Sequence, residues 1–178
     1  MAKRKFWSSD KLLALTALFI SLLTLFIFIW QTNIISKQSH LSVMPYLLLD
    51  SANNSQEMTF SIDFNNHGVG PAIIVKKEIL YNGNTYDLEF YDFLQQHVPG
   101  MDSVNVINHS TMQNGLAIPS GNKRNVITVG GDMKSYQTFL SIMSELQKNE
   151  FHYEIVYKSI YDDRWVINSI TNEPNAIE

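Results

Sequence analysis

The sequence predicts a mainly β protein, in which an N-terminal single transmembrane helix precedes an antiparallel β-sandwich or small barrel with one or two short helices. Two observations predict this fold class. An apolar run without any charged residue, Pro or Gly covers residues 12–30. Farther along, apolar and polar residues alternate in short segments separated by turn signals such as Asn82-Gly83, which is typical of strands with one buried face.

The apolar run has the length of a membrane span. Nineteen residues extend about 28 Å as a helix, close to the roughly 30 Å hydrocarbon thickness of a bilayer. A cleaved signal peptide has a shorter apolar stretch followed by a small-x-small site, and residues 31–36 contain no such site. We therefore expect an uncleaved signal-anchor that crosses the membrane once.

The charges that flank the run predict its orientation, because Lys and Arg near a span stay on the cytoplasmic side. Four cations precede the run and one follows it within twenty residues (Lys3, Arg4, Lys5 and Lys11; Lys37). Trp7 and Trp30 lie near its two ends, where amphipathic rings prefer the interface. We expect a bacterial inner- or plasma-membrane protein with a cytoplasmic N-terminus and an extracytoplasmic C-terminal domain.

The expected organisation has four parts. Residues 1–11 form a basic cytoplasmic N-terminus, 12–30 the transmembrane helix, 31–44 a juxtamembrane connector and 45–178 one β-rich globular domain. After residue 36 the chain has nine Lys and Arg residues against sixteen Asp and Glu residues. This acidic balance argues against nucleic-acid binding, which needs a basic face. The sequence has no Cys, which excludes disulfides and thiolate metal ligands.

Eight strands and two helices are expected in the domain. The expected strands are residues 46–50, 58–64, 73–81, 85–88, 104–108, 126–129, 151–158 and 165–170. Helical spacing of apolar residues predicts a helix over Tyr136, Phe139, Leu140, Met143 and Leu146, with Asp132 or Ser135 as its N-cap. A weaker helical turn is expected at residues 89–97, and the longest loop at 108–123.

A tight corner is expected between the second and third strands, at residues 66–72. Asn66, Gly68 and Gly70 tolerate positive φ, and Pro71 fixes its own φ and lacks an N–H. Backbone amides around the two glycines would suit an anion-binding nest. We favour the alternative, a rigid structural connection between sheets.

This corner belongs to a wider layout. Pro45-Tyr46 leads into the first strand, residues 66–72 read Asn-x-Gly-x-Gly-Pro-Ala, and Tyr157, Tyr161 and Trp165 belong to a closing hairpin. With the preceding span, this layout resembles a group of small, largely uncharacterised bacterial single-pass membrane proteins. The resemblance covers most of the chain and implies an anchored β-rich domain, and it supplies no catalytic residues.

The residues capable of chemistry are scattered. Five His residues have no pair at metal-ligand spacing (His40, His67, His97, His109 and His152). Asp162-Asp163 is expected as a polar turn rather than a Ca²⁺ site, which needs more oxygen ligands. No nucleophile motif is present. We therefore expect no catalytic residues, no metal, no cofactor and no enzymatic activity.

Small residues form a stripe on the membrane helix. Ala14, Ala17, Ser21 and Thr24 recur at spacings of three and four, which puts them on one side of a helix, and small residues let helices approach closely in lipid. The stripe predicts self-association into a homo-oligomer. The alternative is that small residues, being common in spans, have no such role here.

Three functional classes remain open. We favour a non-enzymatic, membrane-anchored interaction or ligand-binding module whose partners are the bilayer and an unidentified protein or small ligand. The first alternative is a membrane effector, similar to anti-phage effectors, in which the β-domain senses a ligand and the transmembrane helices cluster. The second alternative is an anchored hydrolase whose site is assembled from residues distant in sequence.

Overall fold

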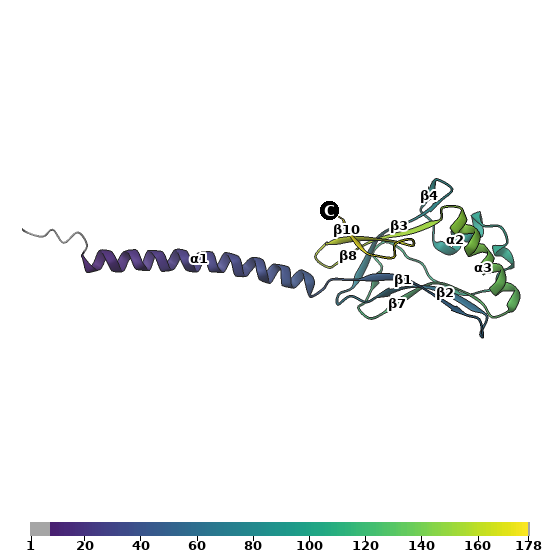
Figure 1. The fold of residues 1–178 in the computed structure, drawn as a ribbon, viewed down its shortest axis with the longest axis horizontal. Helices are drawn as coiled ribbons and strands as arrows, with labels where there is room; N and C mark the ends of the chain where they lie inside the picture. The colour runs from purple at the N-terminus through teal and green to yellow at the C-terminus, as the bar shows by residue number, and fades with distance from the viewer. Residues whose placement is uncertain (1–7, 178) are drawn as a thin grey trace, which may run out of the picture. The chain divides into compact units, whose positions relative to one another are not determined.

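The computed structural model describes residues 8–177, and the chain divides into two compact units after Leu41 (Figure 1). The first unit contains helix α1 (Ser9–Leu41). The basic residues at positions 3–5 and the expected interfacial Trp7 lie outside the described residues. The second unit, from Ser42 onward, contains antiparallel sheets and a few short helices. The expected β-rich domain behind an apolar N-terminal helix is therefore confirmed.

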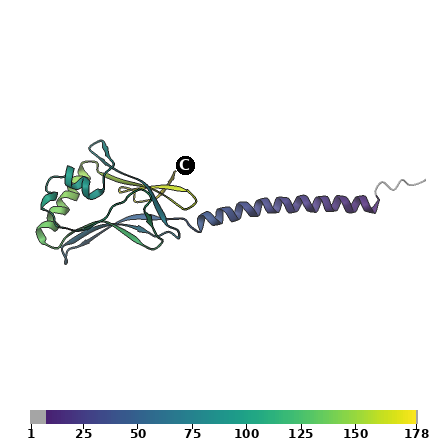
Figure 2. The same ribbon diagram turned by 180° about the vertical axis from the view of Figure 1, so that it is seen from behind.

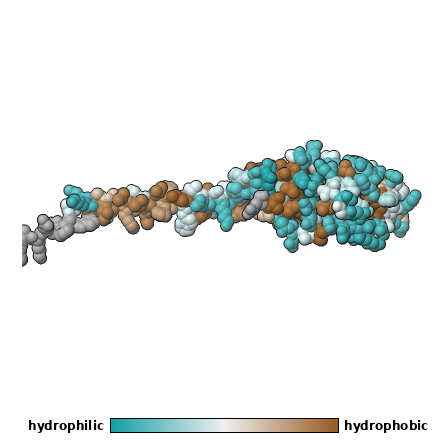
Figure 3. Space-filling model, turned by 90° about the horizontal axis from the view of Figure 1, so that it is seen from above, coloured by the Kyte–Doolittle hydropathy of each residue, from teal (hydrophilic) through white to brown (hydrophobic). Residues whose placement is uncertain are grey.

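Helix α1 is long, apolar and without buried residues. Its 33 residues extend about 50 Å, and it is the one helix within residues 8–177 with the length and composition to cross a membrane. Its apolar residues form a continuous brown band (Figure 3). The helix continues to Leu41, through most of the expected connector 31–44, because residues 31–41 contain neither Pro nor Gly and Pro45 comes only afterwards.

The first sheet, sheet A, has four antiparallel strands in the order β1-β2-β7-β5. Its strands are β1 (Leu47–Asn54), β2 (Thr59–Asn66), β7 (Lys123–Gly130) and β5 (Val106–His109). Strands β1 and β2 form a hairpin in register from Leu47 opposite Asn66 to Asn54 opposite Thr59. Strand β1 therefore lies at one edge of this sheet.

The second sheet, sheet B, has the order β10-β9-β8-β3-β4, and the short β6 pairs with the start of β3. Its strands are β10 (Asn175–Ile177), β9 (Arg164–Asn168), β8 (His152–Lys158), β3 (Ala72–Tyr81), β4 (Asn84–Tyr86) and β6 (Ala117–Ile118). Strands β6 and β10 were not expected. They contain two and three residues, which is too short for a periodic pattern to show.

Short helices lie together at one end of the two sheets (Figures 1 and 2). They are α2 (Phe90–His97), the 3₁₀ turn Met101–Ser103 and α3 (Met133–Lys148). Asp132 is the N-cap of α3, since its carboxylate accepts a hydrogen bond from the Ser135 N–H at 2.8 Å. Of the two N-caps considered, the structure therefore selects Asp132.

The core lies between the sheets and follows the alternation of the strands. In β8 the side chains of Tyr153, Ile155 and Tyr157 are buried and their neighbours are not. A bulge at Val75 in β3 shifts this alternation. It turns Lys77 toward the interior, where its ammonium group lies 3.0 Å from the carboxylate of Glu89. This ion pair is largely buried between the sheets and the chain around α2.

Candidate functional site

The corner at residues 66–72 is organised by the buried side chain of Asn66. Its oxygen accepts hydrogen bonds from the N–H groups of Tyr46 (3.1 Å) and Gly68 (3.0 Å). Its amide nitrogen donates to the carbonyls of Gly70 (2.8 Å) and Ile118 (2.9 Å). One side chain thus joins the corner to β6 and to residues 43–46, which lead into β1.

The two glycines of the corner lie so close to the backbone of residues 43–46, which precede β1, that no side chain would fit there. A Cβ on Gly68 would lie 2.4 Å from the carbonyl oxygen of Met44, and one on Gly70 only 1.9 Å from that of Val43. The Val69 N–H donates to the Met44 carbonyl at 3.0 Å. The amides considered for an anion nest therefore donate to acceptors within the protein. Pro71 directly precedes β3, where the sheet begins.

The expected self-association stripe lies on the exposed surface of α1. Ala14, Ala17, Ser21 and Thr24 fall within an arc of about 80° on a helix that turns about 100° per residue, and all four are exposed. The Thr24 hydroxyl donates to the carbonyl of Ile20 at 2.8 Å. Pairing through the stripe stays a prediction.

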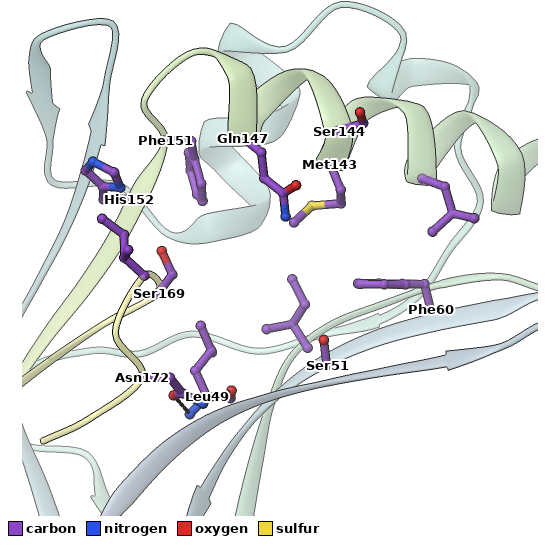
Figure 4. Close-up of a pocket in the computed structure, with 13 residues that line it drawn as sticks. Leu49, Ser51, Phe60, Met143, Ser144, Gln147, Phe151, His152, Ser169 and Asn172 are labelled. Carbon is purple, nitrogen blue, oxygen red and sulfur yellow. Dashed lines mark hydrogen bonds between the residues drawn. The ribbon is translucent and has the colours of Figure 1, made fainter.

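The domain contains a cavity of about 680 Å³ on the side where the β1 edge approaches the loop after β9. Sheet A forms its floor through β1 and β2, and α3 forms its roof (Figure 4). The start of β8 and the loop after β9 line a further side, and the cavity is otherwise open to solvent. Its lining residues are Leu49, Ser51, Phe60, Ile62, Leu140, Met143, Ser144, Gln147, Phe151, His152, Ser169, Ile170 and Asn172.

The cavity lining is apolar and uncharged. Seven of the thirteen lining residues are apolar, and the other six are Ser, Asn, Gln or His, with no Lys, Arg, Asp or Glu among them. Its volume falls within the range of small-molecule sites. A phosphate or carboxylate buried here would find no Lys or Arg to pair with and would pay a large desolvation cost. The lining is therefore suited to an uncharged group.

One polar atom of a residue that lines the cavity, and one atom of the buried residue next to it in β8, have no partner. The Nδ1 atom of His152 is buried without a hydrogen bond among the described residues, and so is the hydroxyl of the adjacent Tyr153. Burial raises the pKa of the Tyr153 hydroxyl far above its ordinary value, so this group stays protonated. By contrast, the hydroxyl oxygen of Ser169 accepts from the Tyr153 N–H at 3.0 Å.

Asn172 connects the cavity to the β1 edge. Its side-chain oxygen accepts from the Leu49 N–H at 2.7 Å, and its nitrogen donates to the Leu49 carbonyl at 2.9 Å. Two residues earlier, the Leu47 N–H donates to the Tyr157 hydroxyl at 3.3 Å. Burial raises the pKa of Tyr157 to about 12. The side chains of Tyr157 in β8 and of Asn172 in the loop after β9 therefore bind the first part of the β1 edge.

Residues 8–177 bring no three His, Asp or Glu side chains close enough together to hold a metal ion. His67 lies 4.0 Å from Asp50 on the outer side of sheet A, and His97 packs against the rings of Tyr86 and Phe93. The Asp162 carboxylate contacts Lys158 at 2.7 Å within the turn between β8 and β9, as expected for a polar turn.

Comparisons with protein families, with curated proteins and with solved structures found no match to this chain. The resemblance to small bacterial single-pass proteins therefore stays a prediction. The cavity was not among the expected sites, because its residues come from five separate segments. Only the apolar spacing on α3 indicated part of it, since Leu140 and Met143 belong to that pattern.

Proposed function

We propose that this protein is a single-pass, membrane-anchored, non-enzymatic binding module whose β-rich domain binds a ligand in the cavity beneath α3. The observation that carries this proposal is the cavity itself, with its largely apolar lining and the unpaired Nδ1 atom of His152. A domain of this size normally fills its interior to near crystal density. A hollow of about 680 Å³ that opens to solvent therefore offers room for a ligand that the fold itself does not fill.

The lining favours a ligand with an uncharged, apolar group of aromatic or branched aliphatic shape. Phe60, Met143 and Phe151 supply contact area. Ser51 supplies a hydroxyl group and Gln147 an amide that point toward the cavity (Figure 4). Neutral donors and acceptors of this kind orient a ligand without neutralising a charge. An anion would be rejected, because the cavity offers it no cation.

Benzamide and benzoate, which have the same shape but differ in charge, test this proposal directly. Full-length protein in lipid nanodiscs is titrated with each compound and binding is followed by ligand-observed NMR. We expect benzamide to bind at least about tenfold more tightly than benzoate, because the cavity is uncharged. Equal binding, or tighter binding of benzoate, would contradict the proposed chemistry.

A matched pair of α3 variants locates the binding. Ser144 lines the cavity, whereas Ser141 is an exposed Ser on the same helix that does not. Ser144→Trp is expected to fill the cavity and abolish benzamide binding, and Ser141→Trp to leave it unchanged. Benzamide binding that survives Ser144→Trp would place the ligand elsewhere.

The proposed topology has a cytoplasmic N-terminus and an extracytoplasmic domain. The four cations before the span, against Lys37 alone after it, support this orientation. Fusions of alkaline phosphatase and of green fluorescent protein to the C-terminus test it. We expect phosphatase activity and no fluorescence, and cytoplasmic fluorescence would reverse the orientation.

A further inference from the structure

We propose that the free edge of β1 binds an extended peptide as an added strand, with alternate apolar side chains of the peptide in the cavity. This inference rests on the proposed function, since it names the ligand class of the same site. Strand β1 pairs with β2 on one side, and the described residues place no strand on its other side. Strand addition at such an edge is a common mode of peptide recognition.

The backbone groups available on this edge follow from the contacts of Leu49. Its N–H and its carbonyl both bind the Asn172 side chain, so they point away from β2. Because backbone groups alternate in direction along a strand, those of Ser51 and Asn53 point the same way. No hydrogen bond to these groups is present within the described part of the chain.

Asn172 already occupies the position of a neighbouring strand. A side-chain amide has the same donor and acceptor as a peptide group, and here it makes the pair of hydrogen bonds that an adjacent strand would make to Leu49. Asn172 itself has φ of 48°, a left-handed conformation that Asn tolerates. A peptide that binds Ser51 and Asn53 would continue this row of hydrogen bonds.

The cavity lies on the inner side of the same edge. Leu49 and Ser51 line it, and a residue paired with Ser51 in an added strand faces the same side of the sheet as Ser51 does. Its side chain would therefore enter the cavity toward Leu140, Met143 and Ile170. Residues two positions away would point the same way, so the peptide needs apolar residues at alternate positions.

The charge of the hairpin favours a basic residue on the outer face of the peptide. The β1–β2 hairpin, residues 47–66, contains no Lys or Arg. Asp50 lies on the outer face next to the free edge with 46% of its side chain exposed, and Glu57 is exposed at the tip. A Lys or Arg beside Asp50 would make a cross-strand pair of opposite charge.

A second copy of this chain fits the edge less well. If two β1 edges paired with each other, the inward positions of the added strand would be Ser51 and Asn53 of the other copy. These small polar side chains would leave the apolar cavity unfilled. A peptide with larger apolar residues fills it, so the shape and chemistry of the cavity favour a peptide.

A phage-displayed library of random dodecapeptides, selected on the full-length protein in lipid nanodiscs, tests this inference. We expect enriched peptides to alternate apolar residues with polar or basic ones. Ser51→Pro removes the edge N–H, and Pro is tolerated where that group faces solvent. It is expected to weaken binding of the enriched peptides at least about tenfold, whereas Ser51→Ala, which keeps the N–H, changes binding less than about threefold.

N-methylated peptides give a second readout that does not alter the protein. Methylation of alternate backbone nitrogens, those that donate to β1, is expected to abolish binding, and methylation of the intervening ones to have little effect. Enriched peptides without alternation, or binding indifferent to Ser51→Pro and to N-methylation, would overturn strand addition. So would concentration-dependent pairing of two copies that Ser51→Pro abolishes.

The two proposals fail in distinguishable ways. Benzamide binding that Ser144→Trp abolishes and Ser51→Pro leaves unchanged, without any enriched peptide, would overturn strand addition and retain the cavity as a small-molecule site. Peptide binding that Ser51→Pro weakens but Ser144→Trp does not would retain the edge and overturn the cavity. Loss of peptide binding in both variants supports the combined site.

Discussion

The corner at residues 66–72 and the cavity beneath α3 differ in how completely their polar groups are paired and their space is filled. In the corner every hydrogen-bonding group of the Asn66 side chain has a partner, and Gly70 leaves no room for a methyl group. At the cavity, the buried Nδ1 atom of His152 lacks a partner and a large volume is open. The packing of the corner therefore stabilises the fold, whereas the cavity has room and polar atoms left for contacts with another molecule.

This difference shows where function should be sought in such a chain. The most distinctive sequence motif, Asn-x-Gly-x-Gly-Pro-Ala, lies where the backbone is most closely packed. The candidate binding site has no motif, because five separate segments contribute between two and four residues each. Substitutions in the corner should therefore affect folding, and substitutions at the cavity should affect binding while the domain stays folded.

The largest effect is expected from Gly70→Ala. The new Cβ would lie 1.9 Å from the Val43 carbonyl oxygen, which is backbone and cannot rotate away. We expect the free energy of unfolding to fall by more than about 3 kcal/mol, or the domain not to fold, as measured by chemical denaturation. Gly83→Ala is the control, because it meets open space and costs only about 1 kcal/mol through its positive φ. If Gly70→Ala and Gly83→Ala lowered the free energy of unfolding equally, the close packing of the corner would not be important for stability.

Asn66→Ala is expected to have the next largest effect. It removes four hydrogen bonds and leaves buried backbone groups of the corner unpaired. We expect a loss of about 2–4 kcal/mol in the free energy of unfolding. Asn66→Asp keeps the two accepted bonds and loses the two donated ones. If both variants were as stable as the unaltered protein, the corner would not be the stabilising element that its geometry indicates.

A smaller effect is expected from alkaline pH through Tyr157, which holds the start of β1. Its pKa is about 12 in the folded domain and about 10 in an unfolded chain. The unfolded chain therefore releases the proton first, so stability is complete below about pH 10 and falls by about 1–2 kcal/mol as pH rises toward 12. Thermal melts between pH 9 and 11.5 measure this, and Tyr157→Phe should reduce the slope. If stability fell with pH as steeply in the Tyr157→Phe variant, Tyr157 would not be the group responsible.

The smallest effect on the domain, essentially none, is expected from the α1 stripe. Ala17→Leu with Ser21→Leu should leave domain unfolding unchanged and weaken self-association in a membrane two-hybrid assay at least about fivefold, because larger side chains hold helices apart. Leu15→Ala with Leu22→Ala, on the opposite side of α1, changes side-chain volume by a similar amount and is the control. Unchanged association in the Ala17/Ser21 variant would remove the stripe as an interface.

The pattern of α3 shows how far the sequence predicts this structure. Helical spacing correctly placed Phe139 and Leu146 in the core. The same spacing includes Leu140 and Met143, but they are only half-buried, since the cavity lies beneath them. Periodicity indicates which face of an element points inward. It does not indicate whether the opposite wall is close enough to fill the space.

The contacts of Asn172 and Tyr157 lay beyond sequence reasoning for another reason. They join β1 to residues 123 and 110 positions farther along the chain, and no local pattern specifies such a pairing. The expected strand 165–170 also extended past the end of β9 at Asn168. The loop that follows contains Asn172, which has a left-handed backbone and binds Leu49.

The distance along the chain between β1 and the residues that bind it, Tyr157 and Asn172, also determines the order in which they are synthesised. Strand β1 emerges from the ribosome soon after helix α1, yet the side chains that bind its first edge groups, Tyr157 and Asn172, follow 110 and 123 residues later. At about 5–20 residues per second, β1 waits roughly 5–20 s for them. During that interval the edge of β1 lacks the side chains that bind it in the folded domain, and an unprotected strand edge can pair with other chains.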